Sequence, residues 1–234
     1  MGLTEPIVEA VLAIDAGNSK TDVCVVSVDG ALLASARGGP FRADRVGAVA
    51  ALAVITPAVE TAIAAAGSVR IRHVAACLAN LDLPVQHQAV EGAVAAAGWA
   101  PSCEVVNDTF ALLRAGLDES RGVAVVCGAG INCTGHRRDG RDVRFAAVGH
   151  ISGDWGGGGF LWTEAMWWAA RAEDGRGPDT ALRTALPEHF GLSSMAGLIE
   201  AVHLGALPGH FGLDSMAALI EAVHLGQLPE ERCM

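Results

Sequence analysis

The stretch that decides the fold is Asp15-Ala-Gly-Asn-Ser-Lys-Thr-Asp22, which stands between two apolar runs at 7–14 and 23–28. The two runs predict β-strands, and the polar residues between them predict a tight turn that contains glycine. The backbone N–H groups of such a turn crowd toward one point with no side chain in the way, which makes the tip a natural cradle for phosphate. An ordinary hairpin turn has the same local pattern, so the choice depends on the rest of the chain.

Composition and charge exclude several classes of protein. Hydrophobic residues make up 51% of the 234 residues and charged residues 18%, which predicts a substantial core and argues against disorder. The length suits one large domain or two small ones. The net charge of −10 argues against non-specific nucleic-acid binding, which depends on a basic surface.

Cysteine usage and the N-terminus predict a cytoplasmic location. The six cysteines are scattered without a CxxC pair, which indicates reduced thiols. The N-terminus lacks the basic and long apolar regions of a signal peptide. No uninterrupted apolar run reaches the ~18 residues that a membrane helix needs, so no membrane partner is expected.

The first part of the chain reads as a mixed α/β domain. Strands are predicted at 7–14, 22–28, 31–37, 69–78 and 103–106, and helices at 44–66, 84–97 and 110–115. Pro57 is expected to kink or divide the first of these helices. Three strands followed by alternating helices and strands favour a sheet with crossover connections.

A second lobe then begins with the same arrangement. A strand at 122–127 leads into Gly128-Ala129-Gly130, and strands at 131–136 and 143–148 follow, so strand, glycine turn, strand, turn and strand occur twice. A glycine run at 156–159 precedes a predicted helix at 160–172. We therefore predict two domains, an N-terminal lobe at 1–106 and a second lobe at 107–234.

The tail contains a true sequence repeat. The segment 186–205 recurs at 207–226 with few changes, an offset of 21 residues. Two copies are too few for a solenoid, so the repeat indicates a local duplication. Each copy predicts a loop and one amphipathic helix, with Ser193 or Asp214 near the helix cap.

Two glycine turns on two similar lobes, with an acidic residue at a strand end between them, suit an ATP-dependent phosphotransferase. That chemistry needs amide donors around the phosphates, a carboxylate that holds Mg²⁺ through water, and a carboxylate that accepts a hydroxyl proton. Asp15 suits the metal role and Asp108 the role of base. Asp108 also suits a helix N-cap, and the two interpretations are compatible.

Four motifs occur in the order found in a known family. They are Ile14-Asp-Ala-Gly-Asn-Ser-Lys-Thr-Asp22, Val105-Val-Asn-Asp-Thr-Phe-Ala-Leu112, Val126-Cys-Gly-Ala-Gly-Ile-Asn-Cys133 and Gly149-His-Ile-Ser-Gly-Asp-Trp-Gly156. Over about residues 10–205 the chain resembles the BadF/BadG/BcrA/BcrD ATPases, a group that includes the N-acetylglucosamine kinases. The resemblance implies a two-lobed, ribonuclease H-like α/β fold of the sugar-kinase, actin and heat-shock-chaperone superfamily.

The resemblance also implies site residues. Asp108 would be the catalytic base, and Asp15 would hold Mg²⁺ through water. The ATP phosphates would be bound by a first loop and a second loop, made of Asp15, Gly17, Asn18, Ser19, Lys20 and Thr21 and of Gly128, Ala129 and Gly130. The sugar side would be lined by Asn80, Asp82, Asn107, Gly149, His150 and Asp154. The implied activity is transfer of the γ-phosphoryl group of ATP to a hydroxyl of N-acetylglucosamine or a related hexose.

The sequence departs from the family pattern in two places. Trp155 and Gly157 stand where the sugar kinases usually have an acidic residue and a serine, which puts N-acetylglucosamine itself in question. Family members also continue for roughly another hundred residues, so the resemblance implies C-terminal truncation, an incomplete second lobe and a helical tail. An open second sheet would favour a homodimer.

The alternatives to an active kinase are a catalytically impaired fragment that binds sugar or phosphate, and an activator-type ATPase of the same family. The activator type would need exposed cysteines for an iron–sulfur cluster.

Overall fold

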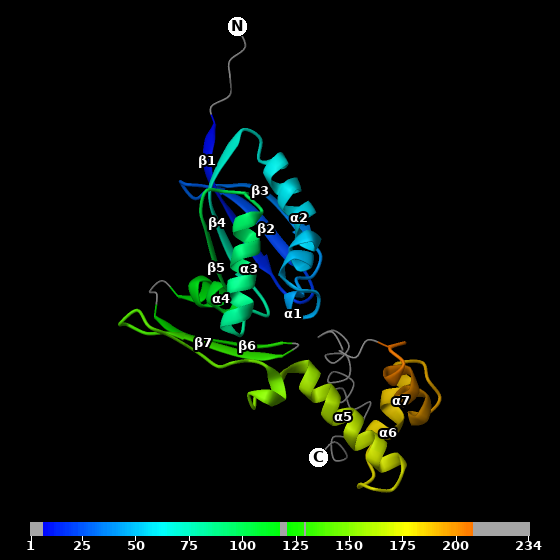
Figure 1. Ribbon diagram of the computed structural model, residues 1–234. Helices are drawn as coiled ribbons and strands as arrows, with labels where there is room; N and C mark the ends of the chain where they lie inside the picture. The colour runs from blue at the N-terminus through cyan, green and yellow to red at the C-terminus, as the bar shows by residue number, and fades with distance from the viewer. Residues whose placement is uncertain (1–6, 118–120, 129, 208–234) are drawn as a thin grey trace. The chain divides into compact units, whose positions relative to one another are not determined.

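The computed structural model describes residues 7–117, 121–128 and 130–207, and it begins with the predicted hairpin (Figure 1). Strands β1 (Val8–Ala16) and β2 (Thr21–Ser27) pair antiparallel, with Ala16 opposite Thr21. Alternate residues of β1, from Ala10 to Ala16, are buried, because side chains of a strand point to opposite faces of the sheet. The decisive stretch is therefore the turn of a hairpin, as predicted.

Five strands form the first sheet, in the order β3-β2-β1-β4-β5. Strand β3 (Leu32–Gly38) pairs antiparallel with β2, whereas β4 (Val69–Leu78) and β5 (Cys103–Asn107) run parallel to β1. The carboxyl ends of β1, β4 and β5 therefore meet at one edge of the sheet. Ligands of open α/β sheets bind at such an edge.

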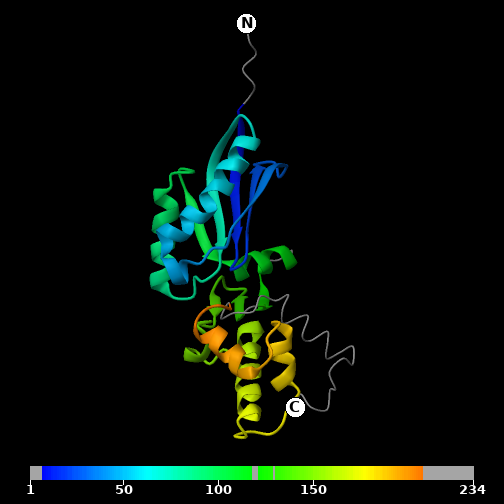
Figure 2. The same cartoon turned by 90° about the vertical axis from the view of Figure 1, so that its right-hand side faces the viewer.

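Two helices cover one face of this sheet, and their apolar residues make the main core (Figures 1 and 2). They are α2 (Ala48–Ala65), which follows the short α1 (Ala43–Val46), and α3 (Pro84–Ala96). Helix α4 (Asp108–Gly116), green in Figure 2, lies on the other side of the sheet and contacts β1, β4 and β5. The carboxyl edge thus lies beside the start of α4.

Pro57 does not divide helix α2, which continues through this residue, and the expected kink stays a prediction. The hydroxyls of Thr56 and Thr61 bond back to the carbonyls of Leu52 and Pro57, at 2.9 and 2.7 Å. By length and composition alone α2 could cross a membrane. Its inner face, however, packs into the core against the sheet, as in a core helix of a globular domain.

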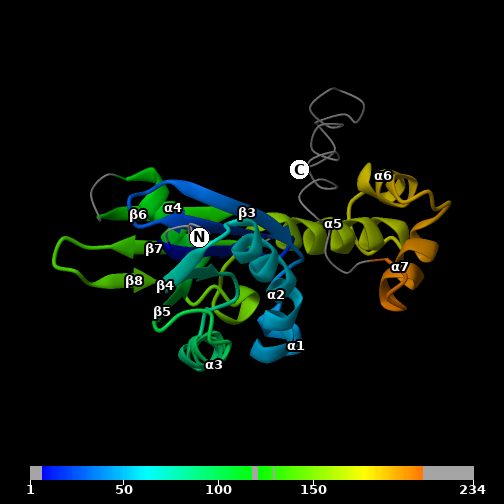
Figure 3. The same ribbon diagram turned by 90° about the horizontal axis from the view of Figure 1, so that it is seen from above.

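A second sheet contains β6 (Gly122–Cys127), β7 (Ile131–His136) and β8 (Asp142–Arg144), side by side in that order (Figure 3). The third strand was expected to run to residue 148 but ends at Arg144. A 3₁₀ turn, η1 (Gly149–Ile151), follows.

Three further helices follow, α5 (Gly157–Glu173), α6 (Leu182–His189) and α7 (Met195–His203). Helix α6 corrects the prediction for the first repeat, which had residues 186–189 in a loop. Leu186 and Pro187 are buried, so packing against the neighbouring helices favours helix here. Most of the second repeat lies outside the described residues.

The chain divides into two compact units. The first contains Met1–Val125 and Cys133–Ala146, and the second contains Val126–Asn132 and Ala147–Met234. The domain boundary at residues 106 and 107 stays a prediction.

Candidate functional site

The first candidate loop closes the β1–β2 hairpin. The amide of Gly17 donates to the carbonyl of Lys20 at 2.8 Å, and the carbonyl of Gly17 accepts from the amide of Phe41 at 2.9 Å. Asn18 and Ser19 stand at the exposed tip. Thr21 is fully buried, and its hydroxyl donates to the carbonyl of Gly39 at 2.8 Å, so Thr21 braces the loop from beneath.

Beside this loop the strand ends bring two carboxyl groups together. In the sheet register Asp15 pairs with Cys77 of β4, and Cys77 pairs with Val106 of β5. Val106 stands two residues before Asp108. Burial raises the pKa of Cys77 to about 11, and the Asp15 and Asp108 carboxylates add to the effect. Asp15 and Asp108 therefore lie near the same thiol, although 93 positions separate them in the sequence.

Both carboxyl groups hold protons more tightly than usual. Burial, followed by the nearby charge of Asp22, raises the pKa of Asp15, and Lys20 opposes the change. Burial also raises the pKa of Asp108, with further contributions from Asp15 and Asp82. Such a cluster of like charges in a partly buried edge is typical of functional sites.

Asp22 behaves differently. The Arg37 guanidinium, at 2.6 Å, and Lys20, at 3.0 Å, lower the pKa of Asp22. Lys20, expected to contact ATP, is thus in an exposed ion pair.

The predicted residues Asn80, Asp82 and Asn107 lie around this edge and support it. Asn80 has a left-handed backbone (φ 61°), and its side-chain amide donates to Asn18 Oδ1 at 2.8 Å and to the Phe41 carbonyl at 3.1 Å. It fixes the tip of the first loop.

Asn107 is buried and caps α4, because its Oδ1 accepts from the amide and hydroxyl of Thr109. The Thr109 hydroxyl also bonds to the buried hydroxyl of Thr134 in β7. This cap orients the first turn of α4, which carries Asp108. The N-cap is thus Asn107, and Asp108 is the first residue of the helix.

Arg144 is a site residue that the sequence reasoning missed. Its guanidinium donates to Asp82 Oδ1 at 2.9 Å and to the Leu81 carbonyl at 2.8 Å. The two charged side chains are 21% and 14% exposed. Arg144 also lowers the pKa of Asp108, which limits the effect of burial.

The second unit contains a pocket of about 330 Å³, a volume near the lower end of the range of roughly 300–1,000 Å³ for small-molecule sites. Gly130 of the second loop lines it, together with three residues predicted for the sugar side, Gly149, His150 and Asp154. The pocket therefore brings together parts of two predicted motifs. Ala129 lies outside the described residues.

The glycine run explains how this pocket is built. The amide of Gly158, in the first turn of α5, donates to the carbonyl of Gly128 at 2.7 Å. Gly157 has φ 77°, and a Cβ there would lie 2.6 Å from the backbone of Gly130. The glycines thus let the second loop approach the N-terminus of α5, and the N-terminus of a helix favours an anion.

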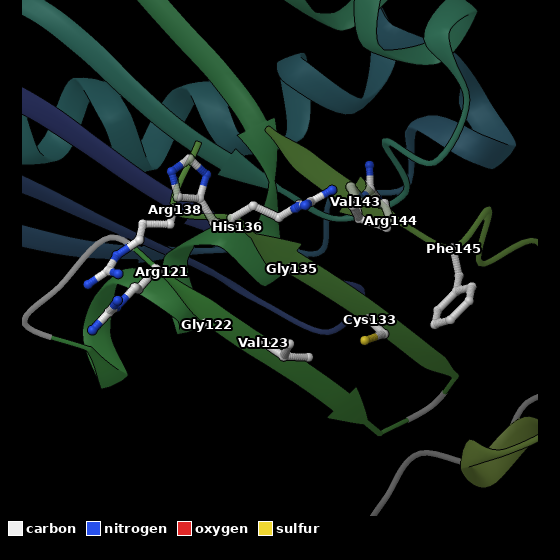
Figure 4. Close-up of a pocket in the computed structure, with 11 residues that line it drawn as sticks. Arg121, Gly122, Val123, Cys133, Gly135, His136, Arg138, Val143, Arg144 and Phe145 are labelled. Carbon is white, nitrogen blue, oxygen red and sulfur yellow. The ribbon is translucent and has the colours of Figure 1, made fainter. Parts of the chain in front are cut away.

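A larger pocket of about 700 Å³ lies on the second sheet, where Figure 4 shows Arg121, Arg138 and His136 at one end and Val123, Cys133 and Phe145 at the other. None of its residues was among the predicted site residues, although the strands of the second sheet were predicted. Among the described residues no group of three His, Cys, Asp or Glu side chains could by itself hold a metal ion.

The comparisons with known proteins agree with this fold. The N-acetylmuramic acid/N-acetylglucosamine kinase of Clostridium acetobutylicum is 27% identical over 195 residues, which cover 82% of this chain. The chain spans 64% of the length of that relative.

Two solved structures, described provisionally as N-acetylglucosamine kinases, are similar in fold. The Chromobacterium violaceum protein has a TM-score of 0.64 at 22% identity, covering 82% of this chain and 71% of its own. The Porphyromonas gingivalis protein has a TM-score of 0.61 at 23% identity, covering 94% and 74%. The predicted α/β fold is thereby confirmed, since both structures share it. Residues 12–208 match the family model, so the chain belongs to the BadF/BadG/BcrA/BcrD ATPase family.

Proposed function

We propose that the protein is an ATP-dependent sugar kinase, which transfers the γ-phosphoryl group of ATP to a hydroxyl of N-acetylglucosamine or a related hexose. The observation that carries the proposal is the half-buried Asp108 carboxyl, held beside Asp15 and the glycine hairpin with a raised pKa. Membership of an ATPase family and the sugar-kinase relative support it.

Asp108 would accept the proton of the attacking hydroxyl. A general base works best when its pKa lies near the working pH, because it is then ionised and still holds the proton firmly. Burial raises the pKa of Asp108 toward the working pH. The nearby charge of Arg144 stabilises the ionised form and limits this rise. The Asn107 cap holds the turn that carries Asp108 in place.

The two glycine loops would bind phosphates through backbone amides, a role that needs no side chain. The first is the Gly17–Lys20 turn, which the Asn80 amide fixes through Asn18. The second is the Gly128–Gly130 turn at the start of α5. Gly149, His150 and Asp154 line the pocket beside it and would contact the sugar.

The residues fit Mg²⁺ held in part by the nucleotide. Mg²⁺ keeps several waters and binds through one or two carboxylates and the substrate phosphates, not through a dedicated protein cage. Asp15, an exposed carboxyl next to the first loop, suits this role. When bound, Mg²⁺ would neutralise charge on the phosphates.

The test is release of ADP from Mg-ATP by the purified chain, with a panel of hexoses and with Asp108→Asn in parallel. We expect release that depends on one sugar and is lost in Asp108→Asn, while the thermal unfolding of the variant shows an intact fold. Equal activity in both proteins would remove Asp108 from the mechanism.

No release from either protein, together with binding of ATP or sugar, would instead favour the impaired binding protein. A cytoplasmic location and a homodimer stay predictions, and gel filtration tests the second.

A further inference from the structure

Helix α7 packs into a groove that α5 and α6 form. Met195 and Leu198 of α7 are 1% and 0% exposed and join Trp162 and Ala169 of α5 and Leu186 of α6 in one cluster. Phe190, Leu192 and Val202 pack around the same cluster. The first repeat, 186–205, therefore supplies most of the apolar surface that covers α5.

The second repeat has every one of these packing residues. Over 20 positions the two copies differ at three, where Glu188, Ser193 and Gly197 become Gly209, Asp214 and Ala218. Glu188 and Ser193 are exposed, and none of the three belongs to the packed cluster. Met216, Leu219 and Val223 match the residues with which α7 fills the groove.

The difference between Gly197 and Ala218 favours binding of the second copy. A Cβ added at Gly197 would approach Ser194 Oγ alone, at 3.4 Å, so alanine fits this position of the bound helix. Alanine favours helix over glycine by a factor of about five in equilibrium constant. The N-cap serine is also kept, since Ser215 corresponds to Ser194, whose hydroxyl accepts from the amide of residue 197.

The length of the connecting loop favours binding of the first copy. Between α6 and α7 the loop consists of residues 190–194, whereas with 216–224 in the groove it would consist of 190–215. Lengthening a loop from five to 26 residues lowers the population of the closed form by about tenfold. The two effects nearly cancel, so the two arrangements differ by about twofold to threefold.

We propose that the groove of α5 and α6 accepts either copy, so that residues 216–224 of the same chain exchange with α7. The duplication then provides a second segment that can replace α7. The replacement matters when a substitution weakens the packing of α7, because the second copy can restore the same apolar contacts.

The test is hydrogen exchange by mass spectrometry on the full chain, with Leu198→Ala, Leu219→Ala and the double variant. The peptides 195–203 and 216–224 differ at Gly197 and Ala218, so their masses tell them apart. In Leu198→Ala we expect protection to move from 195–203 to 216–224, while exchange of the α5 amides rises by only about threefold to fourfold. The double variant, with no intact copy, is expected to raise α5 exchange by at least about thirtyfold.

The proposal is overturned if Leu198→Ala exposes α5 as strongly as the double variant does, or if 216–224 gains no protection. Leu219→Ala is the matched control, and it should leave α7 protected. Compensation that appears only at high protein concentration, with a dimer on gel filtration, would overturn exchange within one chain and indicate exchange between chains.

Discussion

Replacing Arg144 by methionine tests how the candidate site is held together. The change removes the hydrogen bonds to Asp82 Oδ1 and to the Leu81 carbonyl and keeps an unbranched apolar stem at this position. Asp82 would then be a carboxylate 14% exposed that has lost the bond from Arg144, while Asn107 Nδ2 still donates to its Oδ1 at 3.4 Å. Breaking a buried ion pair on one side costs about 3–5 kcal/mol, and the partial exposure points to the lower end, about 3 kcal/mol.

The assay is native-state hydrogen exchange of the β4 and β5 amides, which reports the free energy of opening of this unit. Asp82→Asn in the Arg144→Met background removes the carboxylate charge that Arg144 had balanced and should recover most of the loss, to within about 1 kcal/mol of the wild type. A cost below about 0.5 kcal/mol for Arg144→Met, or no recovery in the double variant, would refute the ion pair as a support of the site.

Three further changes test separate parts of the site. Asp108→Asn should abolish turnover and stabilise the fold at neutral pH. Because the folded pKa of Asp108 is raised, the folded state binds more protons than the unfolded state between the two pKa values, so stability falls as pH rises through that window; urea unfolding of both proteins at pH 4 and pH 7 checks the sign. Gly157→Ala should cost about 2–4 kcal/mol, since the Cβ meets the Gly130 backbone at 2.6 Å at positive φ; an unchanged melting temperature would contradict this. Alkylation of Cys77 at pH 8 should be slow, because a pKa of about 11 leaves about one thiol in a thousand ionised, and mass spectrometry should find the exposed Cys127 modified before Cys77.

The strands of the sheet could be predicted from the sequence because the pattern that specifies each strand lies within the strand itself and the turn beside it. Buried residues alternate along β1 from Ala10 to Ala16, and glycine marks the turn that follows. The predicted bounds of the strands at 69–78, 122–127 and 131–136 agree with the structure. The motif order likewise predicted the family.

Other parts of the site depend on contacts between distant residues. Arg144 and Asp82 are 62 positions apart, and Thr109 and Thr134 are 25 apart, so no spacing in the sequence links them. Helix α6 forms where its own residues favoured a loop, because Leu186 is buried by its neighbours. The assigned contacts of Asn80 and Asp82 with sugar stay predictions, since the structure shows both side chains engaged with the protein.

Asn80 also limits how this site can evolve. Its backbone is left-handed, which glycine and asparagine tolerate best, and its side chain must donate to two oxygen atoms. Glycine would keep the backbone and lose the donor, whereas aspartate would set a carboxylate against the two acceptors. Of the two acceptors only Asn18 Oδ1 belongs to a side chain, so we expect a change at position 80 to be accompanied by a change at position 18 among related sequences.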